Sequence, residues 1–473
     1  MIRNASQGII KISEKNPHYF EYKGKEILLI TSAEHYGAVI NKKFDYVKYF
    51  DTLAEYGLNY TRIFPGALIE PEGYWSPGDP MGPGENTIVP WARSNVPGYK
   101  GGGCKFDLSK WDVEYFTRLR DFLAQADKRG IIVEICFFSC QNIVYWEYCP
   151  LHKNANIQGV GDCDHITFQT LDNEPLVREQ IRYLEKIIEE TNSFNNVIYE
   201  FCDEPTLMLT AAHKAYHWLS HLIGKAIETE NRLNKKHMIS QQLEIGVDFS
   251  DDDRVSFIVT QYIVMLARQV GGITALNNCY CYNKPIESNE MAFVPVWYDY
   301  EHEAISRIEA WEFMVGGGSS FNQLNGYFTT SNPAGDNDIN HRILAGLRNL
   351  RRFLESFDYI RMYRDNDTVR KVSIAASVNM ISEKGMQYAV YMHHSMLNFG
   401  CRVPGQHYEP AYGKYEPVVT VKLEKGDYRV TFVEPETLKI LKEIMVSSDS
   451  QEMMLACPPY KLDIAIKIIR SGQ

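Results

Sequence analysis

Two short apolar segments of the sequence each end on a glutamate, and such a pair could cleave a glycosidic bond. Residues 196–205 read Asn-Val-Ile-Tyr-Glu-Phe-Cys-Asp-Glu-Pro, so a strand-like run ends on Asp203 and Glu204. Residues 283–290 read Asn-Lys-Pro-Ile-Glu-Ser-Asn-Glu and end on Glu290. In this chemistry one carboxylic acid protonates the leaving oxygen, and a second carboxylate about 5–5.5 Å away attacks the anomeric carbon. Glu204 and Glu290 are therefore the candidate catalytic residues.

The elements that must position these acids alternate between strand and helix patterns, which is typical of parallel βα units. Eight strands are predicted at residues 27–32, 59–64, 131–138, 197–201, 238–243, 256–262, 285–288 and 319–324. Helices are predicted at residues 44–56, 111–129, 174–190, 211–234, 305–315 and 339–356. Eight βα units predict a TIM barrel, in which chemistry takes place at the carboxyl ends of the strands. Glu204 and Glu290 would end the fourth and seventh strands and could meet across the barrel mouth.

The last part of the chain changes character and predicts a second domain. Short β-rich runs are found at residues 372–376, 387–391, 418–423, 427–432 and 462–469. Gly, Pro and charged residues separate them, which is typical of a small antiparallel β-sandwich. The predicted fold class is thus α/β: a (β/α)8 barrel over residues 1–358 and a sandwich over 359–473, on which residues 1–22 could pack. Two long insertions, 67–110 and 139–173, either form the walls of a cleft at the barrel mouth or lie there without contacting a ligand.

Composition restricts the partners. The chain has 473 residues and a net charge of −11, so nucleic acid is not expected as a partner, because phosphate binding needs a basic face. Apolar runs fall short of the length of a membrane span, and the first residues lack the apolar core of a signal peptide. We expect a cytoplasmic protein, or an exported one whose leader is absent from this sequence. No pattern indicates an oligomeric state.

The sequence predicts no cofactor and no metal. The ten cysteines include no C-x-x-C pair, which disfavours a zinc site and indicates free buried thiols. A bridge between Cys149 and Cys163 remains an option for an exported protein. His213, His217 and His221 have helical spacing but lack the Glu of an H-E-x-x-H motif. They are predicted to lie on a solvated or half-buried helix face.

The two strand ends resemble the acid/base and nucleophile motifs of clan A glycoside hydrolases, and family 5-like members with a C-terminal sandwich look closest. The resemblance implies a retaining enzyme that acts on an oligo- or polysaccharide, with Glu204 as acid/base and Glu290 as nucleophile. Arg62 matches the second-strand arginine that braces the nucleophile. Tyr262 resembles the sixth-strand tyrosine that hydrogen-bonds it.

The sequence departs from this family at one position. The clan normally has Asn before the acid/base, where this chain has Asp203, and an ionised Asp can only accept hydrogen bonds. Adjacent acids also raise one another's pKa, which could help to keep Glu204 protonated. The change could equally indicate a different sugar or lost activity. A non-catalytic carbohydrate-binding barrel derived from a hydrolase is therefore the alternative function.

Further substrate contacts are predicted around the mouth, together with Arg62, Asp203 and Tyr262. His35 and Tyr36 follow the first strand and would either contact sugar hydroxyls or belong to a packed loop. Trp297 is a candidate stacking wall.

The nucleophile has rivals in the sequence. A second strand-like run at residues 293–298 precedes Asp299 and Glu301, and either acid would take the role if that run were the seventh strand. Glu290 is preferred because Lys-Pro-Ile precedes it in the family manner.

Overall fold

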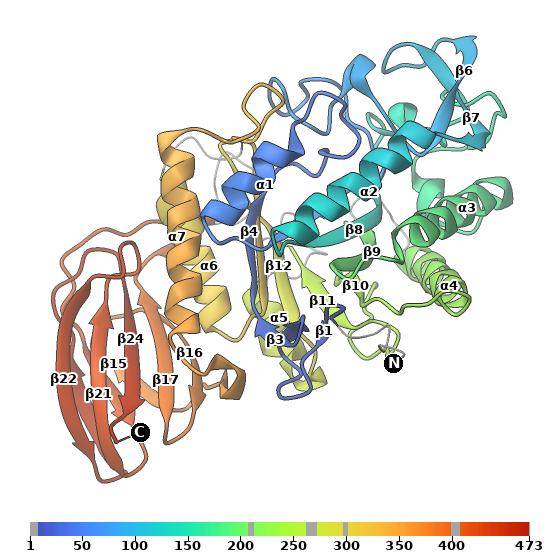
Figure 1. Cartoon of the computed structure of the whole chain (residues 1–473). Coiled ribbons are helices and arrows are strands. Elements are labelled where there is room, and N and C mark those ends of the chain that lie inside the picture. Colours follow the sequence, from blue (N-terminus) through green and yellow to red (C-terminus); the bar gives the residue numbers. More distant parts are fainter. Residues whose placement is uncertain (1–7, 207–211, 262–271, 297–300, 399–406, 473) are drawn as a thin grey trace.

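The architecture is that of a computed structural model, in which residues 8–206, 212–261, 272–296, 301–398 and 407–472 are described (Figure 1).

Eight parallel strands form one sheet in the order β4-β13-β12-β11-β10-β9-β8-β5. They are β4 (Leu29–Ala33), β5 (Tyr60–Ile63), β8 (Ile132–Ser139), β9 (Val197–Asp203), β10 (Ile239–Gln242), β11 (Phe257–Thr260), β12 (Ile286–Val294) and β13 (Ser320–Asn325). The two outer strands of this order meet, because the Asn59 N–H donates to the Ile30 carbonyl at 3.3 Å. The sheet is therefore a TIM barrel, and each of the eight predicted strands is present.

Helices cover the outside of the barrel. They are α1 (Tyr46–Glu55), α2 (Val113–Lys128), α3 (Glu174–Thr191), α4 (Ala212–Glu230), α5 (Gly272–Cys279), α6 (His302–Val315) and α7 (Asp338–Glu355), with short 3₁₀ turns at Gly84–Asn86, Trp146–Tyr148, Ile166–Gln169, Tyr280–Tyr282 and Tyr359–Arg361. Asp45, Asp112, Asn173 and Asn337 cap α1, α2, α3 and α7 by accepting a hydrogen bond from a first-turn N–H. No helix in the described parts of the chain is long and apolar enough to span a bilayer.

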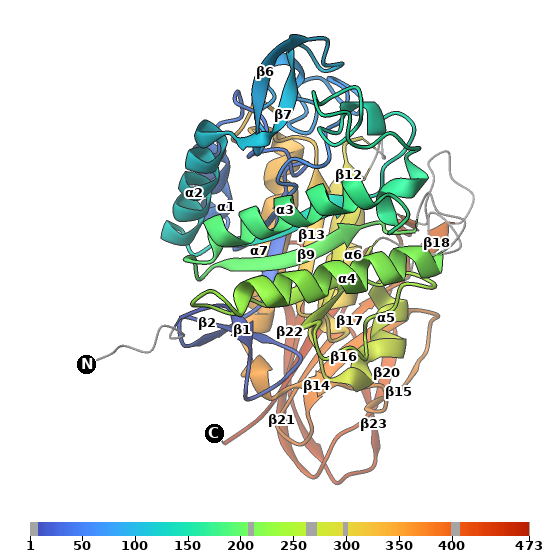
Figure 2. The same ribbon diagram turned by 90° about the vertical axis from the view of Figure 1, so that its right-hand side faces the viewer.

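The two ends of the barrel are covered differently. At the amino end of the strands, β1 (Lys11–Ile12), β2 (Phe20–Tyr22) and β3 (Lys25–Ile27) form a small antiparallel sheet, and Phe20 packs edge-on against Phe257 of β11. Asn16 in this segment also donates to the carbonyls of Ile360 and Met362, at 2.9 and 3.2 Å. The insertion that carries the hairpin β6 (Trp91–Pro97) and β7 (Cys104–Trp111) lies at the opposite end (Figure 2).

The C-terminal region is a β-sandwich beside α6 and α7 (Figure 1). Its strands are β14 (Tyr363–Arg364), β15 (Val369–Val372), β16 (Ser377–Glu383), β17 (Gln387–His393), β18 (Met396–Asn398), β19 (His407–Glu409), β20 (Val418–Lys422), β21 (Gly426–Val433), β22 (Ile440–Ser448), β23 (Glu452–Ala456) and β24 (Asp463–Arg470). A six-stranded sheet, β14-β16-β17-β24-β21-β22, and a three-stranded sheet, β15-β20-β23, enclose an apolar core. The predicted run 372–376 is wrong, because β15 ends at Val372 and an exposed bend follows it. Arg307 of α6 pairs with Asp463 of β24 and ties the sandwich to the barrel.

Candidate active site

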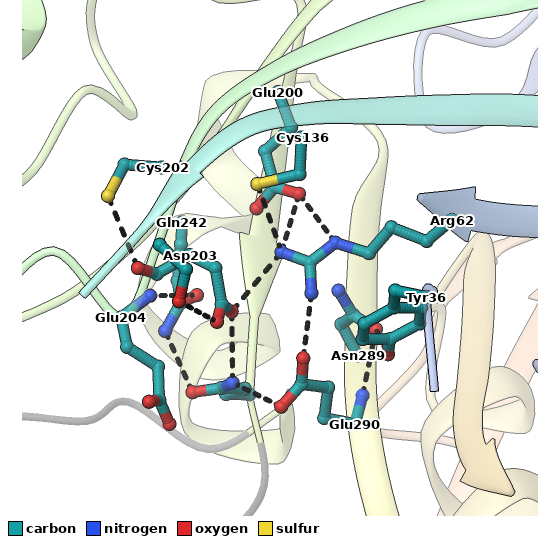
Figure 3. A network of polar contacts seen from close by, with 12 residues as sticks. Tyr36, Arg62, Cys136, Glu200, Cys202, Asp203, Glu204, Gln242, Asn289 and Glu290 are labelled. Carbon is teal, nitrogen blue, oxygen red and sulfur yellow. Dashed lines mark hydrogen bonds and ion pairs between the residues drawn. The ribbon is translucent and has the colours of Figure 1, made fainter. Parts of the chain in front are cut away.

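Arg62 joins the carboxyl ends of three barrel strands. Its side chain extends from β5 and is fully buried. It donates to Glu290 of β12 at 2.7 Å, to Glu200 of β9 at 2.7 Å and to Asp203 of β9 at 3.2 Å (Figure 3). One guanidinium therefore fixes the fourth and seventh strand ends relative to the second, since its planar fork sets the direction of each bond.

Glu290 is held by a second donor and by an unusual backbone. Gln261, which follows β11, donates to the other carboxylate oxygen of Glu290 at 2.8 Å. The strand β12 does not end here but continues to Val294, with register shifts on either side of Met291. Glu290 itself has a φ of 55°, a left-handed conformation that is strained for a residue with a side chain. The first strand-like run of the sequence and the start of the second, Phe293 and Val294, thus belong to one bulged strand, and the bulge turns Glu290 toward Arg62.

Glu204 lies just beyond β9, also in a left-handed conformation, with a φ of 47°. Its N–H donates to the Gln242 side chain at 2.9 Å, and the Cys140 thiol donates to its carboxylate at 3.4 Å. The side chain is half-buried. Figure 3 shows the carboxyl groups of Glu204 and Glu290 at the same edge of the polar network. The structure therefore brings both predicted acids, Arg62 and Asp203 into one site.

Acids outnumber cations in this network, and burial makes this excess of negative charge unfavourable. Burial and the neighbouring Asp203 charge raise the pKa of Glu290 to about 8, against the opposing effect of Arg62. Burial likewise raises the pKa of Glu200 to about 8. One arginine between three carboxylates leaves the site short of positive charge.

A second polar layer lies deeper in the barrel. The Tyr60 hydroxyl bonds to Glu134 of β8 and, at 3.0 Å, to Glu287 of β12. Burial raises the pKa of Glu134 and of Glu287. Sequence reasoning missed these acids. The available signal was that Glu134, like Glu200, interrupts an apolar strand, where a charge is unfavourable without a partner. Glu287 is followed by polar residues and gives no such signal.

His35 lies between two carboxylates from the first insertion. Its Nδ1 is 2.8 Å from Asp79 and 4.0 Å from Glu70. Although burial alone would lower the pKa of His35, Asp79 and Glu70 raise it to about 10. Within the described parts of the chain, His35, Glu70 and Asp79 form the group whose potential ligand atoms lie within 4.8 Å of one another, close enough to hold a metal ion. A protonated His35 already supplies the positive charge between these carboxylates, so the group is satisfied as an ion pair.

Tyr36 is fully buried and supports the nucleophile candidate from behind. Its hydroxyl donates to the Asn289 side chain at 3.1 Å, and the same oxygen of Asn289 accepts from the Glu290 N–H at 2.8 Å. The Arg62 guanidinium lies 5.0 Å from the centre of the Tyr36 ring. These contacts fix the bulge; a contact between Tyr36 and a sugar stays a prediction.

Other predicted residues lie elsewhere. Tyr262, Trp297 and Asp299 fall outside the described residues. The rival nucleophile Glu301 is exposed at the start of α6 and accepts a hydrogen bond from Tyr412 at 2.7 Å, so it takes no part in the contacts around Arg62.

His213, His217 and His221 are exposed on α4, as predicted for a solvated helix face. Cys149 and Cys163 are both free thiols.

The fold is shared with solved glycoside hydrolases. A glycoside hydrolase family 5 protein from Bacteroides vulgatus has a TM-score of 0.63 at 11% identity, over 99% of this chain and 94% of its own. A second protein of that bacterium has a TM-score of 0.62 at 14% identity, over 99% and 83%. A further glycoside hydrolase has a TM-score of 0.62 at 10% identity, over 99% and 98%. No family model and no curated protein matches the sequence. At such identities the likeness establishes the fold, and function has to be argued from the site.

Proposed function

We propose that the protein is a retaining glycoside hydrolase that cleaves O-glycosidic bonds of an oligo- or polysaccharide by double displacement. The observation that carries this proposal is the Arg62 network, which joins the strand end bearing Glu204 to the bulge bearing Glu290. The shared fold supports the same class of reaction.

In the first step Glu204 acts as the acid and Glu290 as the nucleophile. A Glu290 oxygen forms a bond to the anomeric carbon while the bond from that carbon to the leaving oxygen breaks. The Glu204 proton passes to the leaving oxygen, so the aglycone departs as an alcohol. Arg62 and Gln261 hold the nucleophile by hydrogen bonds to separate oxygens, which fixes the direction of attack.

In the second step the roles of Glu204 reverse. Its carboxylate takes a proton from water, the water oxygen bonds to the anomeric carbon, and the bond to Glu290 breaks. The sugar leaves with its original anomeric configuration, and both acids return to their starting protonation states. Retention follows from the two successive inversions at one carbon.

The test combines stereochemistry with two isosteric variants. Proton NMR of early hydrolysis products should show the anomer of the substrate. Glu204→Gln should abolish turnover of glycosides with poor leaving groups. For aryl glycosides with good leaving groups it should largely spare kcat/KM, which reports the first step, and lower kcat, because the second step loses its base. Glu290→Gln should inactivate the enzyme toward both. Loss of less than about tenfold in Glu204→Gln toward poor leaving groups would exclude Glu204 as the acid/base.

A non-catalytic carbohydrate-binding barrel is the second candidate. The raised pKa of Glu290 favours it, since a protonated carboxyl is a poor nucleophile. The binding function would be established if the unmodified protein bound to a glycan array and showed no turnover from pH 5 to 9.

A further inference from the structure

We propose that the sugar bound next to Glu290 carries a protonated amino group at C2, as in 2-amino-2-deoxy sugars, and that Asp203 binds this group. The inference rests on the proposed function, because it takes Glu290 as the group that attacks C1. It adds the class of substrate, which neither the fold nor the two catalytic acids specify.

The position of Asp203 relative to Glu290 supports the contact. Gln261 donates through the same nitrogen to Glu290 at 2.8 Å and to Asp203 at 3.2 Å. The two accepting oxygens are therefore at most 6.0 Å apart, the sum of these distances. A sugar whose C1 faces Glu290 presents its C2 substituent one carbon away, within reach of an acid that shares a donor with Glu290, as Asp203 does (Figure 3).

The hydrogen bonds of Asp203 leave it able to accept another. One oxygen accepts from Arg62 and Gln261, and the other accepts from the Ser139 hydroxyl at 3.0 Å. These bonds use three of the roughly four lone-pair sites of a carboxylate. The remaining site suits a donor, and a charged donor makes a stronger bond than a neutral one. An amide at this position would offer a hydroxyl both a donor and an acceptor, whereas Asp203 offers acceptors alone.

The charge balance of the site calls for a cation. Arg62 faces three carboxylates, those of Glu200, Asp203 and Glu290, and the positive charge of His35 is already shared with two others. A bound ammonium group would supply a second positive charge among these buried acids. It would also favour ionisation of Glu290, whose pKa is raised to about 8 by burial and by Asp203. Such a substrate would thus activate its own nucleophile.

The experiment compares three aryl β-glycosides that differ only at C2, with an amino, a hydroxyl or an acetamido group. The set is repeated in the gluco, galacto and manno configurations. In the configuration that the enzyme accepts, the amino glycoside should have the highest kcat/KM, by about tenfold or more, since hydrogen bonds between charged groups are the stronger ones. Acetylation removes the charge and should remove the preference.

The variant Asp203→Asn provides the second measurement. It keeps the shape of the side chain and should shift the ratio of amino to hydroxyl kcat/KM by about tenfold toward the hydroxyl sugar. Glu301→Gln is the matched control, because it removes one acidic charge from an exposed position outside the network, and its ratio should equal that of the unmodified enzyme. Far-ultraviolet circular dichroism and competitive inhibition by the free hydroxyl sugar show that each variant folds and binds.

The outcomes separate this proposal from the one on which it rests. Hydrolysis of the hydroxyl glycoside at an equal or higher rate, or an unchanged ratio in Asp203→Asn, overturns the amino-sugar assignment and leaves the hydrolase in place. No hydrolysis of any glycoside by the unmodified protein overturns the proposed function itself.

Discussion

Replacement of Arg62 by Met should destabilise the fold and disable the chemistry together. Arg62 is fully buried and pairs with Glu200, Asp203 and Glu290. Removal of one partner from a buried ion pair costs about 3–5 kcal/mol. The free energy of unfolding should fall by about this amount, and not by three times as much for the three pairs, because carboxyls that lose Arg62 can become protonated. Urea unfolding at pH 7 measures this loss.

Arg307→Met is the matched control for this variant. Arg307 is also a buried arginine, and its Nε lies 3.0 Å from Asp463, a residue that takes no part in the contacts around Arg62. Both variants should lose stability by a similar amount. Arg62→Met should in addition lose about 10²-fold or more in kcat/KM, since a nucleophile displaced by about 1 Å loses that much. The acidic limb of the pH–activity profile of Arg62→Met should also move to higher pH, because Arg62 lowers the pKa of Glu290.

The comparison has a clear negative result. If both variants, assayed at a temperature where each is folded, lost activity equally, Arg62 would serve folding alone. An Arg62→Met enzyme with kcat/KM within tenfold of the unmodified protein would contradict the placement of Glu290 as a nucleophile braced by this arginine.

Three further predictions follow from the same contacts. Gly37→Ala should destabilise the protein by about 1–3 kcal/mol and impair activity. The added Cβ would lie 2.2 Å from the backbone of Pro80, next to the segment that carries Asp79, and urea unfolding with the standard assay checks both effects. Glu301→Gln should keep kcat/KM within about twofold, as for other exposed positions; a loss of two orders of magnitude would restore it as the nucleophile. The free energy of unfolding should fall as pH rises from about 5 to 8. The pKa of Glu290, like that of Glu200, is about 8 when folded, so the native state keeps protons that the unfolded chain has released; equal midpoints in urea at pH 5 and 8 would refute this.

The barrel could be predicted from the sequence because its strands are short apolar runs separated by amphipathic helices. The bounds of β12 could not, because the polar residues at its bulges interrupt the apolar pattern. The pattern stops at Ser288 and resumes only at Phe293, near the end of a strand of nine residues. In the sandwich, β22 (Ile440–Ser448) escaped prediction because it is an edge strand with little buried surface, so its apolar and polar residues follow no strict alternation.

The site was partly predictable for a related reason. Glu204 stands at a strand end, where barrel chemistry takes place, so its position pointed to it, whereas Arg62 is indicated by its match to the second-strand arginine of the similar family. Gln261 also ends a strand, yet an amide carries no such signal. Asp79 and Glu70 lie in a long insertion, and only the folded chain shows that this insertion returns to His35.

The central claim is that Glu290 attacks the anomeric carbon. A 5-fluoroglycosyl fluoride slows both steps while its good leaving group lets the intermediate accumulate, and it leaves the C2 substituent intact. Tandem mass spectrometry of the peptides after brief incubation should place one added glycosyl unit on Glu290, and find no label in Glu290→Gln. Label on Glu301, or inactivation without a covalent adduct, would contradict the account.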